Sequence, residues 1–217
     1  MRGITLVFNI YIANKVGSET IGIFSLIMSI YTFAITVATS GLGISCTCIV
    51  SEEFAKGNYL NGIKAVKTGK FFALLLGIVA GILIILFSPI ISHFWLKDAV
   101  SPLPLYAIAI GLPFISISSV IGGYFSSVDK SYKSAIAQVL ELTVKIIFTI
   151  FFLNFTISKG IEAICVSLIL ADVISEIFSF TLNSIMYSFD KRDYCKRNKI
   201  PIQMKRRIFS IAFPISV

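Results

Sequence analysis

Long apolar runs separated by short polar connections form the main pattern of this chain. A bilayer core about 30 Å thick needs about 20 helical residues to cross it, so each such run predicts a transmembrane helix. Complete spans are expected at residues 21–40, 71–96, 103–125, 135–157 and 161–183. The pattern therefore predicts an all-α fold, a polytopic transmembrane helix bundle.

Each end of the chain carries an apolar stretch too short to cross a bilayer. As helix, the charge-free part of residues 1–14 would extend about 18 Å and residues 208–217 about 15 Å. We interpret residues 1–186 as an N-terminal six-helix bundle with a truncated first helix, residues 187–207 as a basic linker, and residues 208–217 as the truncated start of a seventh helix. A signal peptide is the alternative at the N-terminus, but Tyr11-Ile12-Ala13 lacks the small residue expected three positions before cleavage.

The longest charge-free run, from Thr20 to Ser51, would be about 48 Å long as one continuous helix. A helix of that length must tilt strongly or break within the membrane. The sequence Ser40-Gly41-Leu42-Gly43 is the expected break, because glycine weakens a helix interior.

Composition agrees with a membrane protein. Hydrophobic residues make up 56% of the chain and charged residues 14%, with a mean hydropathy of +0.90, whereas about a quarter of the residues of a soluble domain are charged. The net charge of +8 would suit nucleic acid, but the basic residues lie between apolar runs and not on a soluble face. No nucleic-acid partner is expected.

Metal or cofactor chemistry is not expected either. The four cysteines form no CxxC pair and His93 is the only histidine, so a zinc site lacks ligands. A membrane-embedded prenyl-phosphate enzyme would need clustered aspartates for magnesium, and no DDxxD motif occurs. The chain is therefore not expected to be an enzyme.

The basic residues divide unequally between the alternate connections, which predicts orientation. One side holds Arg2, Lys56, Lys64, Lys67, Lys70, Lys130, Lys133 and the eight basic residues from Lys191 to Arg207. The other side holds only Lys15, Lys97 and Lys159. The first side, with the N-terminus and the linker, is therefore expected to be cytoplasmic, in the plasma membrane.

Four ionisable residues inside the last two complete spans need an explanation, because each costs about 2.5–3.5 kcal/mol at the centre of a membrane helix. Glu141 and Lys145 are four residues apart, as are Asp172 and Glu176. Counted along the two antiparallel helices, Lys145 falls level with both acids of the other span, which predicts contact across the interface. The charges belong to longer polar stripes that also include Gln138, Thr149, Ser175, Ser179 and Asn183. A water-accessible cavity is the favoured interpretation, and a buried ion-pair network with one protonated acid is the alternative.

A third polar stripe runs along the span at residues 21–40. It consists of Ser25, Ser29, Thr32, Thr36 and Thr39. These spacings place the stripe on one helix face, which we expect to point into the bundle. Tight helix packing is the favoured interpretation and cavity lining the alternative. Gly77 and Gly81 form a GxxxG pattern whose default interpretation is also packing.

Several short motifs, in this order, resemble a known family. They are Gly17-Ser-Glu-Thr-Ile-Gly22, Thr39-Ser-Gly-Leu-Gly43, Ser51-Glu-Glu-Phe-Ala-Lys-Gly57, Gly123-Tyr-Phe125 and Gln138-Val-Leu-Glu141-Leu-Thr-Val-Lys145. The chain resembles stage V sporulation protein B and its relatives in the polysaccharide-exporter branch of the multidrug, oligosaccharidyl-lipid and polysaccharide exporter superfamily. It departs from the family pattern where Lys145 replaces arginine, Leu142 replaces glutamine and Gly43 replaces proline.

The resemblance implies a transporter that works by alternating access, with two six-helix bundles in full-length members. It implies a polyprenyl-diphosphate-linked sugar as substrate, for cell wall, capsule or spore cortex, and a missing C-terminal half or a second copy as partner. The candidate substrate or ion pathway residues are Gln138, Glu141, Lys145, Asp172 and Glu176, with Ser25, Ser29, Thr32, Thr36, Ser179 and Asn183 as cavity-lining candidates. A cation-coupled multidrug antiporter that uses Asp172 and Glu176, and a non-transporting fragment, are the alternatives.

Overall fold

The computed structural model describes residues 2–39, 41–94, 101–157 and 160–195, with side chains described from residue 7 to residue 191 within these ranges. All regular structure in them is helical, which confirms the all-α prediction. The helices are α1 (Arg2–Val16), α2 (Ser18–Thr39), α3 (Leu42–Ala55), α4 (Tyr59–Phe94), α5 (Leu103–Ser127), α6 (Ser131–Thr156) and α7 (Ile161–Cys195). Within the described residues, five helical segments are long and apolar enough to cross a membrane, with α2 and α3 taken together as one.

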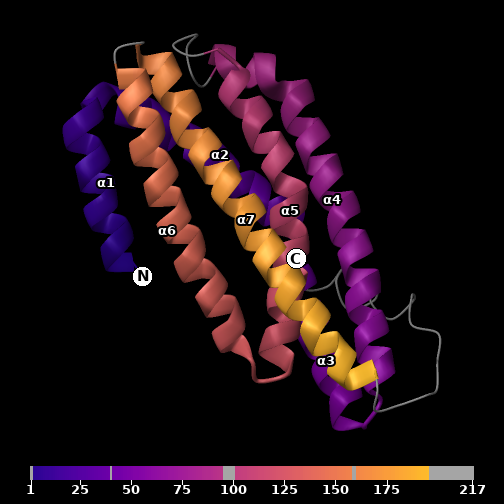
Figure 1. The fold of residues 1–217 in the computed structure, drawn as a ribbon. Helices are drawn as coiled ribbons and strands as arrows, with labels where there is room; N and C mark the ends of the chain where they lie inside the picture. Colours follow the sequence, from indigo (N-terminus) through magenta and orange to yellow (C-terminus); the bar gives the residue numbers. More distant parts are fainter. Residues whose placement is uncertain (1, 40, 95–100, 158–159, 196–217) are drawn as a thin grey trace.

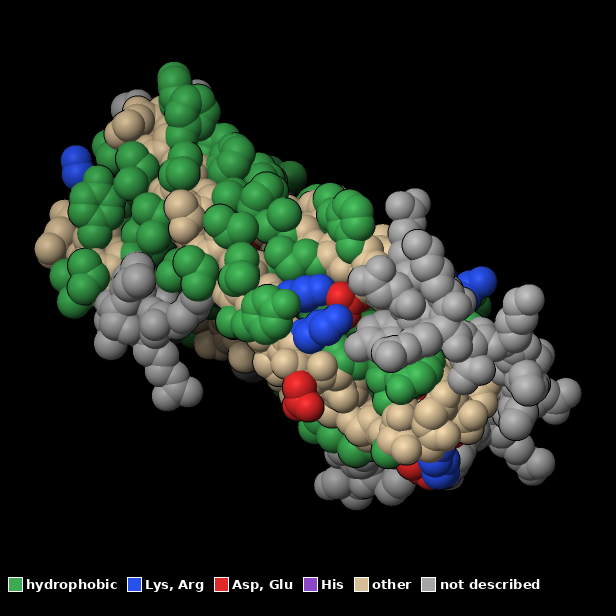
Figure 2. Space-filling model, turned by 60° about the horizontal axis from the view of Figure 1, so that its bottom comes forward, with side chains coloured by type: hydrophobic (Ala, Val, Ile, Leu, Met, Phe, Trp, Pro, Cys, Tyr) green, Lys and Arg blue, Asp and Glu red, His purple; other side chains and the backbone are tan. Residues whose placement is uncertain are grey.

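The helices lie side by side and their ends gather at the two ends of the bundle (Figure 1). Helices α1, α4 and α6 end at the top, where α2, α5 and α7 begin, and α3 and α5 end at the bottom, where α4 and α6 begin. Figure 2 brings the bottom forward and shows most of the charged side chains of that face toward this end, with hydrophobic side chains over much of the flank. An apolar flank with charge at the ends is the surface of a multi-pass membrane protein.

The predicted break in the long apolar run is present. Helix α2 ends at Thr39 and α3 begins at Leu42, and Gly41 between them has a φ of 69°. Only glycine adopts this left-handed conformation without a steric cost. Below the break, α3 packs with α4 and α5 in a core cluster that includes Cys46, Val66 and Val120, whereas α2 packs with α4, α5 and α7 in a second cluster.

Small residues set the spacing between α4 and α5. A Cβ atom on Gly77 would lie 2.7 Å from Cα of Pro113, and a Cβ atom on Gly81 would lie 2.9 Å from the Ala109 carbonyl oxygen. Distances this short leave no room for any side chain. The packing interpretation of the GxxxG pattern is therefore confirmed.

Two helices continue beyond the predicted spans at the bottom of the bundle. Helix α4 begins at Tyr59 and not at residue 71, and α7 runs past residue 183 to Cys195. The start of the predicted linker at 187–207 is thus helical, while its remainder and the predicted seventh helix at 208–217 lie outside the described residues.

Buried Asp190 fastens the lower end of α7 to the α5–α6 connection. Its carboxylate accepts hydrogen bonds from Lys130 Nζ at 3.0 Å and Lys133 Nζ at 2.5 Å. The hydroxyl of buried Tyr124 donates to the same carboxylate at 3.4 Å. These contacts hold α7 against α5 and α6, which places its polar face next to α6.

Candidate substrate pathway

A salt bridge joins α6 and α7 in the middle of their membrane-spanning length. Lys145 Nζ lies 2.8 Å from Asp172 Oδ1, so the predicted contact between the two spans is confirmed. The two side chains differ in access, because 28% of Lys145 and only 6% of Asp172 is exposed. The lysine therefore reaches the protein surface, whereas the aspartate is buried.

Glu176, one turn along α7 from Asp172, connects α7 to α2 and α5. The Tyr31 hydroxyl of α2 donates a hydrogen bond to Glu176 Oε1. The other oxygen, Oε2, is buried and has no hydrogen-bond partner among the described residues. A Cβ atom on Gly111 of α5 would lie 2.9 Å from this oxygen, so glycine at 111 makes room for the carboxylate.

Tyr31 and Gly111 were not predicted from the sequence as site residues. Tyr31 lies on the apolar face of α2 with Ile27, Ala34 and Ala38, all of them buried. A tyrosine on such a face needs a hydrogen-bond partner for its hydroxyl, so its position in the sequence indicates a polar contact with another helix. Nothing in the sequence around Gly111 indicates a site residue, because its role depends on how closely α5 approaches α7.

The remaining predicted residues of α6 and α7 divide by access. Ser179 and Asn183 are buried on the same face of α7 as Asp172. Gln138 is exposed near the lower end of α6, while Glu141 is half-buried. The polar side chains of α7 at this interface are therefore buried, whereas those of α6 are partly exposed at the protein surface.

The polar stripe on α2 is not buried, so the expectation that it points into the described bundle is wrong. Ser25, Ser29, Thr32 and Thr36 are all exposed. Three of these hydroxyls donate instead to a carbonyl one turn earlier in their own helix, at 2.8–2.9 Å. Because these bonds need no second helix, the apolar face of α2 packs and the hydroxyl face turns outward.

The charged cluster of α6 and α7 has an excess of acid. Three carboxylates, Glu141, Asp172 and Glu176, share the single ammonium of Lys145, so full ionisation would leave two uncompensated negative charges. Unpaired charge is costly inside a membrane protein unless water, a proton or a cation reaches it. In the described part of the chain, no three His, Cys, Asp or Glu side chains converge as ligands for a metal ion.

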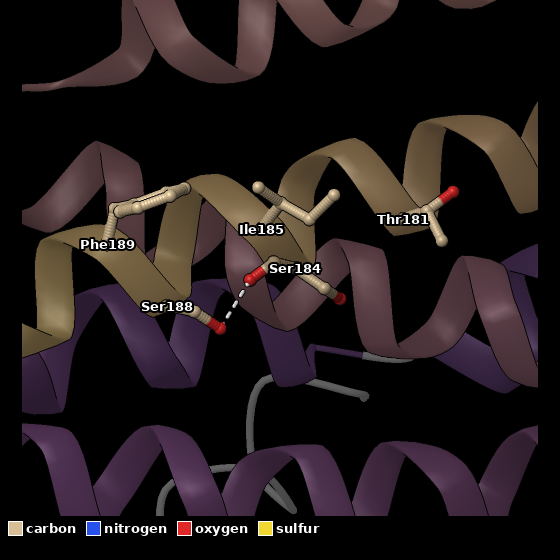
Figure 3. Close-up of a pocket in the computed structure, with 5 residues that line it drawn as sticks. All are labelled: Thr181, Ser184, Ile185, Ser188 and Phe189. Carbon is tan, nitrogen blue, oxygen red and sulfur yellow. Dashed lines mark hydrogen bonds between the residues drawn. The ribbon is translucent and has the colours of Figure 1, made fainter.

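A separate open hollow of about 380 Å³ runs along the lower part of α7. Figure 3 shows its described lining, which consists of Thr181, Ser184, Ile185, Ser188 and Phe189. The Ser188 hydroxyl donates to the Ser184 carbonyl at 2.8 Å, so it is satisfied within the helix. Helical spacing places these residues on the face opposite Asp172 and Glu176, so the hollow is distinct from the charged cluster.

Comparison with known proteins gives one family. The family described as polysaccharide biosynthesis protein matches residues 1–217. Stage V sporulation protein B of Bacillus subtilis (strain 168) is 28% identical over 199 residues, which are 92% of this chain and 38% of that protein. Lipid II flippase MurJ of the same strain is 27% identical over 155 residues, 68% of this chain and 28% of that protein. No solved structure matches the chain.

Proposed function

Because the chain belongs to the polysaccharide biosynthesis protein family, we propose that it forms part of a transporter that flips lipid-linked oligosaccharide or polysaccharide precursors across the plasma membrane by alternating access. The name of one relative, lipid II flippase, supports a lipid-linked substrate. The chain spans about a third of the length of the two curated relatives. The observation that carries the proposal is the partly exposed Lys145, paired with buried Asp172 at membrane depth.

The proposed substrate path combines a cation with an exposed row of hydroxyls. An ammonium group inside a span is suited to a diphosphate, which carries negative charge and accepts hydrogen bonds. The exposed hydroxyl face of α2 is suited to a sugar or to water, and polar side chains at membrane depth usually face a water-filled cavity or another protein surface. We therefore propose that further helices, or a second copy of this chain, close the path opposite this face.

Binding tests the substrate class without requiring the complete path. Lys145→Gln is expected to weaken binding of a polyprenyl diphosphate to the purified chain in detergent by about tenfold or more, because a charge-assisted hydrogen bond contributes about 1.5–3 kcal/mol. Lys145→Arg keeps the charge and should retain most of the affinity. Lys56→Gln removes an exposed lysine paired with Glu52 and serves as the matched control. Equal affinity of Lys145→Gln and the wild type would contradict the proposal.

The excess acid favours one second candidate, a cation-coupled antiporter of the same superfamily. Its supporting observation is the buried Oε2 atom of Glu176, which lacks a hydrogen-bond partner among the described residues. Sodium-dependent thermal stabilisation that Glu176→Gln abolishes, together with no binding of polyprenyl diphosphate, would favour this candidate.

We also propose that the bottom of the bundle faces the cytoplasm, since Lys56, Lys64 and Lys130 lie at that end and Lys15 at the other. In a cysteine-free background, a cysteine in place of Ser101 is expected to react with a membrane-impermeant thiol reagent in intact cells. A cysteine in place of Asn58 should react only after lysis. Labelling of the Asn58 position in intact cells would reverse the orientation.

A further inference from the structure

An apolar groove with a volume of about 350 Å³ runs between α2 and α4. Its lining residues are Ile30, Phe33, Ala34, Val37, Ala80, Leu83, Ile84, Phe87, Ile90 and Ile91. The floor is buried and includes two small side chains, Ala34 and Ala80. The rims are exposed, with Phe33 on the α2 side and Phe87 on the α4 side. The alanines thus create a hollow between two rows of larger side chains.

Both walls of the groove belong to membrane-spanning helices, and every lining side chain is a hydrocarbon. A polar ligand would lose its hydration there and gain no hydrogen bond, which is unfavourable. The groove is therefore suited to a hydrocarbon chain that approaches from the bilayer.

The same helix presents a polar track beside this groove. Thr32 precedes Phe33 and Thr36 precedes Val37, and consecutive helical residues point about 100° apart. The exposed hydroxyls of the α2 stripe and the groove consequently occupy neighbouring faces of one helix. A molecule with a polar head and a hydrocarbon tail can use both faces at once.

We propose that this groove holds the isoprenoid chain of a polyprenyl-linked substrate while its headgroup moves along the hydroxyl face of α2. The proposal rests on the proposed function and adds a tail site to it. A bilayer phospholipid offers similar hydrocarbon, but its headgroup stays at the membrane surface. Only a lipid whose headgroup enters the membrane can contact the groove and the neighbouring hydroxyl face of α2 at the same time.

Photocrosslinking at two neighbouring positions of α4 tests the proposal in the full chain. The photoreactive residue p-benzoylphenylalanine is placed either at Phe87, in the groove, or at Leu86, which is 67% exposed and does not line it. The probes are a fluorescent polyprenyl phosphate and a fluorescent phosphatidylglycerol, each in vesicles of phosphatidylcholine. We expect the polyprenyl probe to label the Phe87 position several-fold more than the Leu86 position, and the phosphatidylglycerol probe to label both equally.

The second part of the experiment fills the floor of the groove with a larger side chain. Ala34→Phe should reduce polyprenyl labelling at the Phe87 position several-fold and leave the Leu86 signal unchanged, whereas Ala135→Phe, at an exposed position of α6, should change neither. The tail site would be overturned if the polyprenyl probe labelled the Phe87 and Leu86 positions equally. It would also be overturned if both probes showed the same ratio of Phe87 to Leu86 labelling. Neither outcome requires the Ala34→Phe variant to fold. The headgroup role of Lys145 is tested separately, by the diphosphate affinity of Lys145→Gln. If that affinity equals the wild-type value while the Phe87 position is still labelled, the tail site stands and the headgroup role of Lys145 is wrong.

Discussion

Replacing Gly123 with alanine is expected to destabilise the bundle by about 3 kcal/mol, at the upper end of the usual cost of overpacking. A Cβ atom at this position would overlap the carbonyl oxygen of Gly43 and lie 3.1 Å from Thr47 Oγ1. The obstacle is backbone, which cannot rotate away as a side chain can, so α3 and α5 would have to separate. Tyr124 and Phe125, both fully buried beside Gly123, would then lose packing with α3.

Thermal unfolding of the detergent-solubilised chain measures this effect, and Gly22→Ala is the matched control. Gly22 lies in α2, and a Cβ atom at this position would have no neighbouring atom within 4 Å. Alanine favours a helix interior over glycine by about 1 kcal/mol, so this variant should unfold at the wild-type temperature or above it. If Gly123→Ala also keeps the wild-type unfolding temperature, the inference that α3 and α5 are in backbone contact at Gly123 is wrong.

The pattern of apolar runs was sufficient to predict the fold class and the break between α2 and α3. It also predicted the pairing of Lys145 with Asp172, because charge inside a membrane is costly and the two positions fall at the same depth. All three inferences depend on physical costs that act locally or on the depth of a residue along its own helix. They therefore require no knowledge of how the helices cross.

The packed face of α2 could not be predicted in the same way. A row of serines and threonines marks one helix face, but their hydroxyls can bond the carbonyl one turn back, so the row does not indicate whether that face is buried. The contact between Tyr31 and Glu176 joins residues 145 positions apart and depends on the helix crossing. Helix ends were missed for another reason, because charge marks the edge of the membrane and α4 and α7 continue beyond it.

Removing Lys145 is expected to have the largest effect of any single substitution in the charged cluster. Lys145→Ala leaves buried Asp172 without its cation and next to two further acids, and breaking a buried pair in this way costs about 3–5 kcal/mol. Asp172→Asn should cost less, because the remaining lysine is partly exposed and can reach water. The Lys145→Ala loss should also shrink at low pH, since protonation removes the unpaired negative charge.

A double-mutant cycle decides whether the two residues act as a unit. The variant Lys145→Ala with Asp172→Asn should recover part of the Lys145→Ala loss, giving a coupling energy of about 1–3 kcal/mol in thermal or denaturant unfolding. The exposed pair of Lys56 and Glu52, 2.6 Å apart, is the matched control and should couple by no more than about 0.5 kcal/mol. If the losses at Lys145 and Asp172 add within about 0.5 kcal/mol, the pair stabilises nothing jointly. A cation that is free of its aspartate would still be able to meet a diphosphate, so this outcome would separate the stability of the helix interface from substrate binding.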